Sequence, residues 1–165
     1  MPQEGVAEKR SRAGFLLVTS VVALFIIDRV GKWLALHILP EEGVFAIPDV
    51  VGFVLERNEG ISYSIPFDPT LITVVVSLII VVLAAAAAVA YRKQNFQLVA
   101  PLVIVIFGAF SNLLDRLQHG YVVDYIILTS WPVFNIADVM VSVGALWIVL
   151  VTLRHGKVVD RRSTT

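Results

Sequence analysis

The sequence predicts an all-α polytopic membrane protein in which four transmembrane helices carry a small β-sheet at the outer membrane surface. Of its 165 residues, 58% are hydrophobic and 16% are charged, and the mean hydropathy is +0.84. Soluble domains have about 45–50% apolar and roughly 25% charged residues. The apolar residues also gather in runs of about 20, the length at which a helix crosses a hydrocarbon core of about 30 Å.

The chain is expected to form a single integral membrane domain, residues 1–165, with spans at 13–39, 71–91, 96–114 and 133–153. Polar residues, among them Asp28 and Lys32, interrupt the second half of the first span. This span follows basic residues, as in a secretory signal peptide. No small-x-small cleavage site comes after it, so the sequence favours a retained anchor.

Basic residues orient these spans, because Lys and Arg concentrate in cytoplasmic loops. They precede the first span, lie between the second and third, and follow the fourth: Lys9, Arg10, Arg12, Arg92, Lys93, Arg154, Lys157, Arg161 and Arg162. The sequence therefore predicts that both termini are cytoplasmic and that segments 40–70 and 115–132 face outward. The tails, residues 1–10 and 156–165, are expected to be disordered.

The first outward segment, residues 40–70, has the composition of short strands. Residues 44–48 and 50–55 are β-branched and aromatic runs separated by Pro and Gly. The sequence therefore predicts a small sheet at the outer membrane surface.

Composition also restricts the chemistry. The chain has no cysteine, which excludes disulfides, thiol nucleophiles, Cys-ligated zinc and iron–sulfur clusters. A net charge of zero without a basic face argues against binding of nucleic acid. The three histidines form no metal-binding motif, and no Gly-x-Ser-x-Gly turn occurs. Neither a metal nor another cofactor is expected, so carboxylates, amides and hydroxyls remain.

Polar groups at the ends of the spans are the most informative residues, because a charge within the bilayer is costly and usually functional. Asp28 and Lys32 are spaced i, i+4 and can pair on one helix face; a salt bridge that anchors the helix would also explain them. Asn58 and Gly60 follow the strand-like segment, where a plain turn is the alternative interpretation.

Two further clusters lie near the third and fourth spans. Asn112, Asp115 and Arg116 can face one side of a helix, or simply cap it at the interface. Asp124 lies in an apolar stretch, where an aspartate is uncommon unless it is hydrogen-bonded or used. In the last cluster, Asn135 is a candidate N-cap that places Asp138 in the first helical turns, and Ala137 leaves room for close backbone approach; capping alone would also account for it.

Together these clusters indicate more than their separate explanations, because the topology places them on one side of the membrane. Asp115, Asp124 and Asp138 would converge with amides and an arginine. Two carboxylates that share a site of low dielectric do not both ionise easily, so one keeps a proton while the other acts as a base. Such a pair could activate water for attack on a peptide carbonyl. Spacing alone does not decide which two aspartates form it.

These motifs resemble those of the lipoprotein signal peptidases, also called signal peptidase II, over about residues 15–150. The resemblance rests on five motifs in order: Asp28-x-x-x-Lys32, Asn58-x-Gly60, Asn112-x-x-Asp115-Arg116, Val122-Val123-Asp124-Tyr125 and Phe134-Asn135-Ile136-Ala137-Asp138. Each motif is short, but their order, spacing and four-span topology make the match specific.

The chain is expected to be a monomer in contact with membrane lipid. The resemblance implies an aspartic endopeptidase of the bacterial cytoplasmic membrane that cleaves diacylglyceryl prolipoproteins on the amino side of the lipidated cysteine. By the same resemblance Asp124 and Asp138 are catalytic, and Asp115 is a supporting residue expected to orient Arg116. The other motif residues are implied to line or adjoin the substrate groove: Asp28, Lys32, Asn58, Gly60, Asn112, Arg116, Asn135 and Ala137.

The chain also departs from the usual family pattern. Arg29 and Gly31 stand where the family often has Gln and Thr or Ser, Ser111 stands where glycine is common, and Glu59, Ile61 and Tyr63 replace small residues.

Two other functions fit the composition. A small proton- or ion-coupled transporter would place carboxylates near the bilayer midplane and on both sides. A non-catalytic assembly factor would tolerate isosteric loss of the aspartates.

Overall fold

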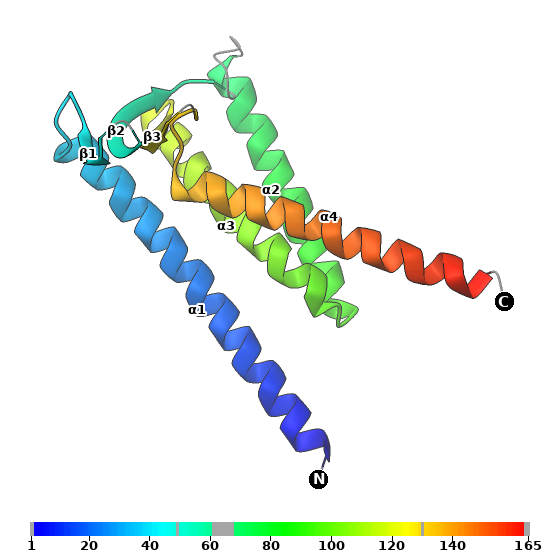
Figure 1. Cartoon of the computed structure of the whole chain (residues 1–165). Helices are drawn as coiled ribbons and strands as arrows, with labels where there is room; N and C mark the ends of the chain where they lie inside the picture. Colours follow the sequence, from blue (N-terminus) through cyan, green and yellow to red (C-terminus); the bar gives the residue numbers. More distant parts are fainter. Residues whose placement is uncertain (1, 49, 61–67, 130, 164–165) are drawn as a thin grey trace.

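The computed structural model describes residues 2–48, 50–60, 68–129 and 131–163. Long helices form a bundle with a three-stranded antiparallel sheet at one end (Figure 1). The helices are α1 (Pro2–His37), α2 (Pro69–Arg92), α3 (Phe96–His119) and α4 (Ile136–Ser163); the strands are β1 (Val44–Ile47), β2 (Val51–Asn58) and β3 (Val122–Leu128). The predicted fold class is confirmed.

Each of the four helices contains a segment long and apolar enough to cross a membrane: Gly14–His37, Pro69–Arg92, Phe96–His119 and Ile136–Arg154. Large apolar side chains cover the outside of these segments, with Phe15, Val81 and Val82 each about two thirds exposed. Such a surface is unfavourable in water and favourable in lipid. α3 is the central helix of the bundle, since it packs against each of the other three.

Both ends of the chain differ from the prediction. α1 begins at Pro2 and α4 continues to Ser163, whereas disorder is expected for residues 1–10 and 156–165. Extending an existing helix fixes one residue for one new hydrogen bond, so a long transmembrane helix can propagate into a polar tail without a second nucleation step. Met1 and residues 164–165 lie outside the described part of the chain.

The sheet contains one strand more than the sequence analysis identified. β1 and β2 correspond to the predicted runs, and β2 pairs in antiparallel fashion with both β1 and β3. β3 is formed by the apolar stretch around Asp124, which lies between Gly120 at the end of α3 and Thr129. The missed signal is its β-branched content between two loop signals. Glu59 follows β2, while Ile61 and Tyr63 lie outside the described residues.

Close helix packing holds the sheet end of the bundle together. A Cβ atom at Gly108 of α3 would lie 2.6 Å from the carbonyl oxygen of Ala137, and one at Gly31 of α1 would lie 2.6 Å from the phenol oxygen of Tyr125. Only glycine fits such contacts without displacing the neighbour. α1 and α3 also pack through Phe25 and Phe107, whose ring centroids are 5.9 Å apart. Toward its N-terminus, α1 diverges from the other helices (Figure 1).

The arrangement of α2 matters for the site. Asp68 caps this helix by accepting a hydrogen bond of 2.7 Å from the Thr70 backbone N–H, and Pro69 occupies its first turn. α2 packs against α3, but among the described residues its backbone does not closely approach that of α4. Residues of α2 and α4 line a common cavity next to α3 at the sheet end of the bundle.

Candidate active site

A cavity of about 780 Å³ lies at the sheet end of the bundle, between α2, α3 and α4. Apolar residues of α2 form one wall, including Leu71, Val75 and Ile79, and the loop from Trp131 to Phe134 borders another. Polar residues gather on the remaining side. They are Asn58, Asn112, Arg116, Asp124 and Asp138, with Gly60 beside them and Ser142 one helical turn beyond Asp138. The carboxylates among these described lining residues are Asp124 and Asp138.

Amide groups hold both carboxylates of the cavity. Asp124 comes from β3 and accepts N–H bonds from Asn58 at 2.9 Å and from Asn135 at 2.6 Å. Asp138 comes from the first turn of α4 and accepts one from Asn112 at 2.8 Å. The two amides meet, since the Asn135 amide donates to the Asn112 oxygen at 3.2 Å. We call Asp124 and Asp138 the amide-bound carboxylates.

Asn135 performs the predicted capping role and a second one. Its side-chain oxygen accepts the Asp138 backbone N–H at 2.8 Å, while the Asp138 carboxylate accepts the Asn135 backbone N–H at 3.3 Å. This reciprocal arrangement is a capping box, with a carboxylate at the third helical position. Because the amide oxygen is used by the cap, the amide nitrogen points to Asp124. The helix cap thereby fixes the two carboxylates relative to each other.

Asn58 is oriented by the turn that the sequence predicts and by a β-bulge. Its side-chain oxygen accepts the Gly60 backbone N–H at 3.1 Å, so its amide nitrogen faces Asp124. In the ladder, Phe53 pairs with Ile126 but Glu56 pairs with Asp124, which inserts one extra residue into β2. Without this bulge, the side chains after it in β2 would point to the opposite face of the sheet, and Arg57 would take the place of Asn58.

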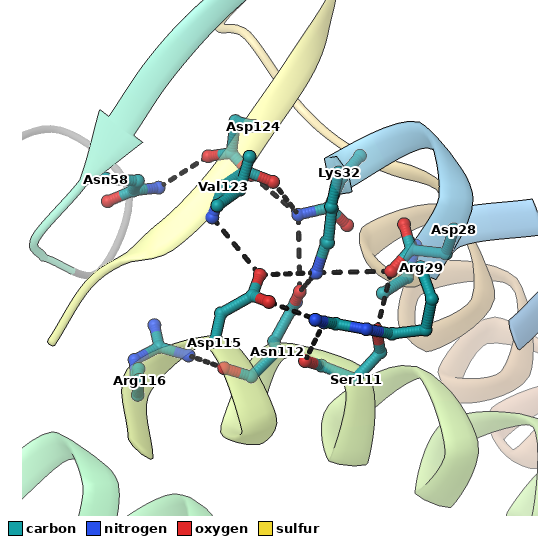
Figure 2. A network of polar contacts seen from close by, with 12 residues as sticks. Asp28, Arg29, Lys32, Asn58, Ser111, Asn112, Asp115, Arg116, Val123 and Asp124 are labelled. Carbon is teal, nitrogen blue, oxygen red and sulfur yellow. Dashed lines mark hydrogen bonds and ion pairs between the residues drawn. The ribbon is translucent and has the colours of Figure 1, made fainter. Parts of the chain in front are cut away.

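Behind this site lies a second polar group, which we call the charge cluster: Asp28, Arg29, Lys32 and Asp115 (Figure 2). Asp28, Lys32 and Asp115 are at most 1% exposed. The Lys32 ammonium lies 3.1 Å from Asp28 and 2.8 Å from Asp115, and donates to the Asn112 oxygen at 2.7 Å. These three contacts use the three N–H groups of the ammonium. The predicted pairing of Asp28 with Lys32 is present.

Asp28 ties α1 to three other elements. One carboxylate oxygen accepts the Ser111 hydroxyl of α3 at 2.6 Å. The other accepts the backbone N–H of Ala137 in α4 at 3.0 Å and the Tyr125 hydroxyl of β3 at 3.4 Å. Ala137 thus permits close approach of the backbone, as its small side chain suggests, and it is fully buried.

Asp115 does not orient Arg116 in the way the resemblance implies. Asp115 makes ion pairs with Arg29 and Lys32 and accepts the Val123 backbone N–H at 3.2 Å. Arg116 points instead into the cavity and donates to the Asn112 backbone oxygen at 3.5 Å. The two residues are adjacent in sequence, so their side chains leave the helix in different directions.

Burial and, to a smaller extent, the negative charge of Asp138 raise the pKa of Asp124 to about 6. The hydrogen bonds from the two asparagines and the charge of Lys32 act in the opposite direction. A carboxyl with such a pKa exchanges its proton near neutral pH, which general acid–base chemistry requires.

Of the other predicted residues, some line the cavity and one is buried beside it. Asn58, Gly60, Asn112 and Arg116 line the cavity, whereas Asn135 is fully buried. Sequence reasoning did not identify Ser111 and Tyr125 as partners of Asp28, nor Arg29 as a partner of Asp115, because these contacts join segments more than 80 residues apart. In the described part of the chain, no three His, Asp or Glu side chains are placed to hold a metal ion.

Known proteins resemble this chain in sequence. The family model described as Signal peptidase (SPase) II matches residues 20–154. A lipoprotein signal peptidase of Chlorobaculum tepidum is 32% identical over 155 residues, covering 86% of this chain and 94% of that protein. One of Mycolicibacterium smegmatis is 33% identical over 162 residues, covering 91% of this chain and 66% of that protein.

Solved structures show the same fold. A bacterial membrane enzyme determined by the in meso method at 2.3 Å resolution has a TM-score of 0.73 and 24% identity, covering 84% of this chain and 88% of that one. The family match extends from within α1 to the end of the apolar part of α4 and includes all five motifs. The chain therefore belongs to the signal peptidase II family, the membrane peptidases of lipoprotein processing.

Proposed function

We propose that this protein is an aspartic endopeptidase that removes signal peptides from diacylglyceryl-modified prolipoproteins, with Asp124 and Asp138 as the catalytic pair. One observation carries the assignment: these are the two carboxylates that line the cavity, and they come from different elements linked by shared amides. By contrast, Asp28 and Asp115 are buried and neutralised by cations. A carboxylate held in an ion pair is a poor base.

In the proposed mechanism, Asp124 keeps the proton that the pair shares, because burial and the charge of Asp138 favour its neutral form. Asp138 takes a proton from water as the water oxygen attacks the scissile carbonyl, and Asp124 gives its proton to the carbonyl oxygen. The tetrahedral intermediate then collapses, the C–N bond breaks, and the leaving amine takes the proton from Asp138. Asp124 recovers its proton as the new carboxyl group forms.

The cavity suggests how the substrate reaches this pair. Its α2 wall is apolar, and the backbones of α2 and α4 do not closely approach each other in the described residues. A hydrophobic signal helix could therefore enter laterally from the membrane between α2 and α4. Arg116 and the amides of Asn58 and Asn112 lie where an extended peptide backbone needs hydrogen-bond partners. The acyl chains of the cysteine would remain in lipid.

The proposed orientation places the sheet and the site at the outer face of the bacterial cytoplasmic membrane. Basic residues lie before the α1 span, between α2 and α3, and after the α4 span, away from the sheet. Both termini are then cytoplasmic. All parts of the proposed site come from one chain, so we propose that the monomer is active.

The test is to incubate purified protein with a diacylglyceryl prolipoprotein and with the same precursor lacking the lipid. We expect cleavage only of the lipidated form, with the lipidated cysteine as the new N-terminus by mass spectrometry. Equal cleavage of both forms would contradict the substrate assignment. Absence of cleavage of either would contradict the proposed function, provided that a related signal peptidase II cleaves the same preparation.

A further inference from the structure

Arg29 forms a contact that the proposed mechanism does not use. It lies on α1 beside Asp28, and its guanidinium donates both to the Asp115 carboxylate and to the Ser111 backbone oxygen of α3 at 3.3 Å. Its side chain is 26% exposed, whereas that of Asp115 is fully buried. Arg29 is therefore a cation at the edge of the charge cluster that reaches inward (Figure 2).

The charge count shows why this cation matters. The cluster contains two buried carboxylates, Asp28 and Asp115, and Lys32 contacts both. The third N–H of Lys32 is already used by Asn112. With Arg29 the cluster is neutral, and without it one ammonium would face two carboxylates. An uncompensated buried charge is unfavourable, so the remaining groups would shift to share Lys32 or take up a proton.

The charge cluster is connected to each amide-bound carboxylate through one intervening residue, Val123 for Asp124 and Asn112 for Asp138. One oxygen of Asp115 contacts Arg29, and the other accepts the backbone N–H of Val123, the residue before Asp124. On the other side, Lys32 holds the oxygen of Asn112, whose amide nitrogen donates to Asp138. The position of Asp115 therefore affects β3 directly and Asp138 through Lys32.

From this arrangement we propose that Arg29 is a positioning residue of the proposed peptidase, which holds Asp115 so that Asp115 can fix both the strand of Asp124 and the ammonium of Lys32. This inference rests on the proposed function. It assigns Arg29 no contact with substrate. A purely structural role, in which Arg29 only attaches α1 to α3 through Ser111, would affect stability but not the ionisation of the catalytic pair.

The pH profile separates these two roles. In Arg29→Gln the cluster keeps one excess negative charge, which disfavours ionisation of the neighbouring carboxyls. We expect both limbs of the profile to move to higher pH by about half a unit, and kcat at neutral pH to fall about tenfold with KM unchanged. The charged and titratable groups that surround the site from each packed element are Asp28 and Lys32 on α1, Glu56 on β2, Asp115 and Arg116 on α3, Asp124 and Tyr125 on β3, and Asp138 on α4.

The experiment measures kcat, KM and the pH profile on a lipidated precursor for wild type, Arg29→Gln and Arg29→Lys, with thermal unfolding in detergent as the folding check. Arg154→Gln, at the end of the membrane-spanning part of α4 remote from the sheet, is the matched control and should behave as wild type. Arg29→Lys keeps the charge and should retain at least about a third of the wild-type kcat with an unshifted profile. Arg29→Gln should show the shift.

A folded Arg29→Gln with wild-type kcat and profile would overturn the inference while leaving the proposed function intact. If Arg29→Gln does not fold, Arg29→Lys decides: a wild-type profile supports the charge role, and a shifted profile contradicts it. Failure of the wild type to cleave the precursor would count against the proposed function itself, which keeps the two failures distinct.

Discussion

Asp28, Asp115, Asp124 and Asp138 lie together at the sheet end of this bundle, and two neighbouring environments divide them into pairs. Asp28 and Asp115 belong to the charge cluster, where Arg29 and Lys32 balance their charges and protein covers them completely. Asp124 and Asp138 line a cavity and are held by neutral amides. No ion pair reaches either of these two within the described residues.

The difference shows that environment rather than residue type sets the role of a carboxyl group. The paired, buried carboxylates join α1 to α3, α4 and β3. A carboxyl group bound only by amides can change its protonation state. Neutral amides stabilise the ionised carboxylate less than a positively charged partner does. Asn112 joins the two environments, accepting from Lys32 and donating to Asp138.

The largest expected effect concerns the amide-bound carboxylates. Asp124→Asn or Asp138→Asn should lower kcat by about 10³-fold or more, because each removes a group that transfers a proton. Cleavage of lipidated precursor and thermal unfolding in detergent are the measurements. Appreciable activity in either folded variant would contradict the division of the four aspartates.

The next effect concerns the charge cluster. Lys32→Met leaves two buried carboxylates with Arg29 as their one cation, and should destabilise the protein by about 3–5 kcal/mol. Thermal unfolding in detergent measures this change. Lys93→Met, at the exposed end of α2, is the matched control and should change stability by no more than about 0.5 kcal/mol. Equal losses in both variants would mean that the cluster adds nothing beyond a surface charge.

A smaller effect follows from the pKa of Asp124, about 6 in the folded protein against an ordinary 3.8. Because the folded-state pKa is raised, the stabilising contribution is complete below about pH 4 and is lost as pH rises through 6. Asp124→Asn cannot ionise. As the pH increases from 4 to 7, the thermal midpoint of the variant should therefore rise relative to that of wild type. The corresponding gain in free energy of unfolding is at most about 3 kcal/mol. A pH-independent difference would show that burial does not perturb Asp124.

The smallest effect is expected at an exposed cation. Arg57 on β2 contacts the Tyr121 hydroxyl at 3.3 Å and lies 5.9 Å from its ring centroid. Arg57→Gln should cost no more than about 1 kcal/mol, because water screens exposed pairs. Unfolding midpoints of this variant and Lys32→Met give the contrast. A loss comparable with that of Lys32→Met would show that burial is not what distinguishes the charge cluster.

Part of this site is readable from local sequence. The capping box of Asn135 and Asp138, the turn of Asn58 and Gly60, and the pair of Asp28 with Lys32 each span at most five residues, so backbone geometry alone brings their groups together. The sequence could not separate Asp124 from Asp115. The distinction depends on Arg29, which reaches Asp115 across 86 positions.

The sequence by itself determined the membrane-spanning helices, because apolar runs of the right length have no other favourable state in lipid. It also determined two strands and the set of polar residues able to do chemistry. Only the tertiary structure decided that β3 completes the sheet and that the β2 bulge turns Asn58, not Arg57, toward Asp124. It also decided which aspartates face the cavity. Those outcomes depend on contacts between distant segments, which no local pattern encodes.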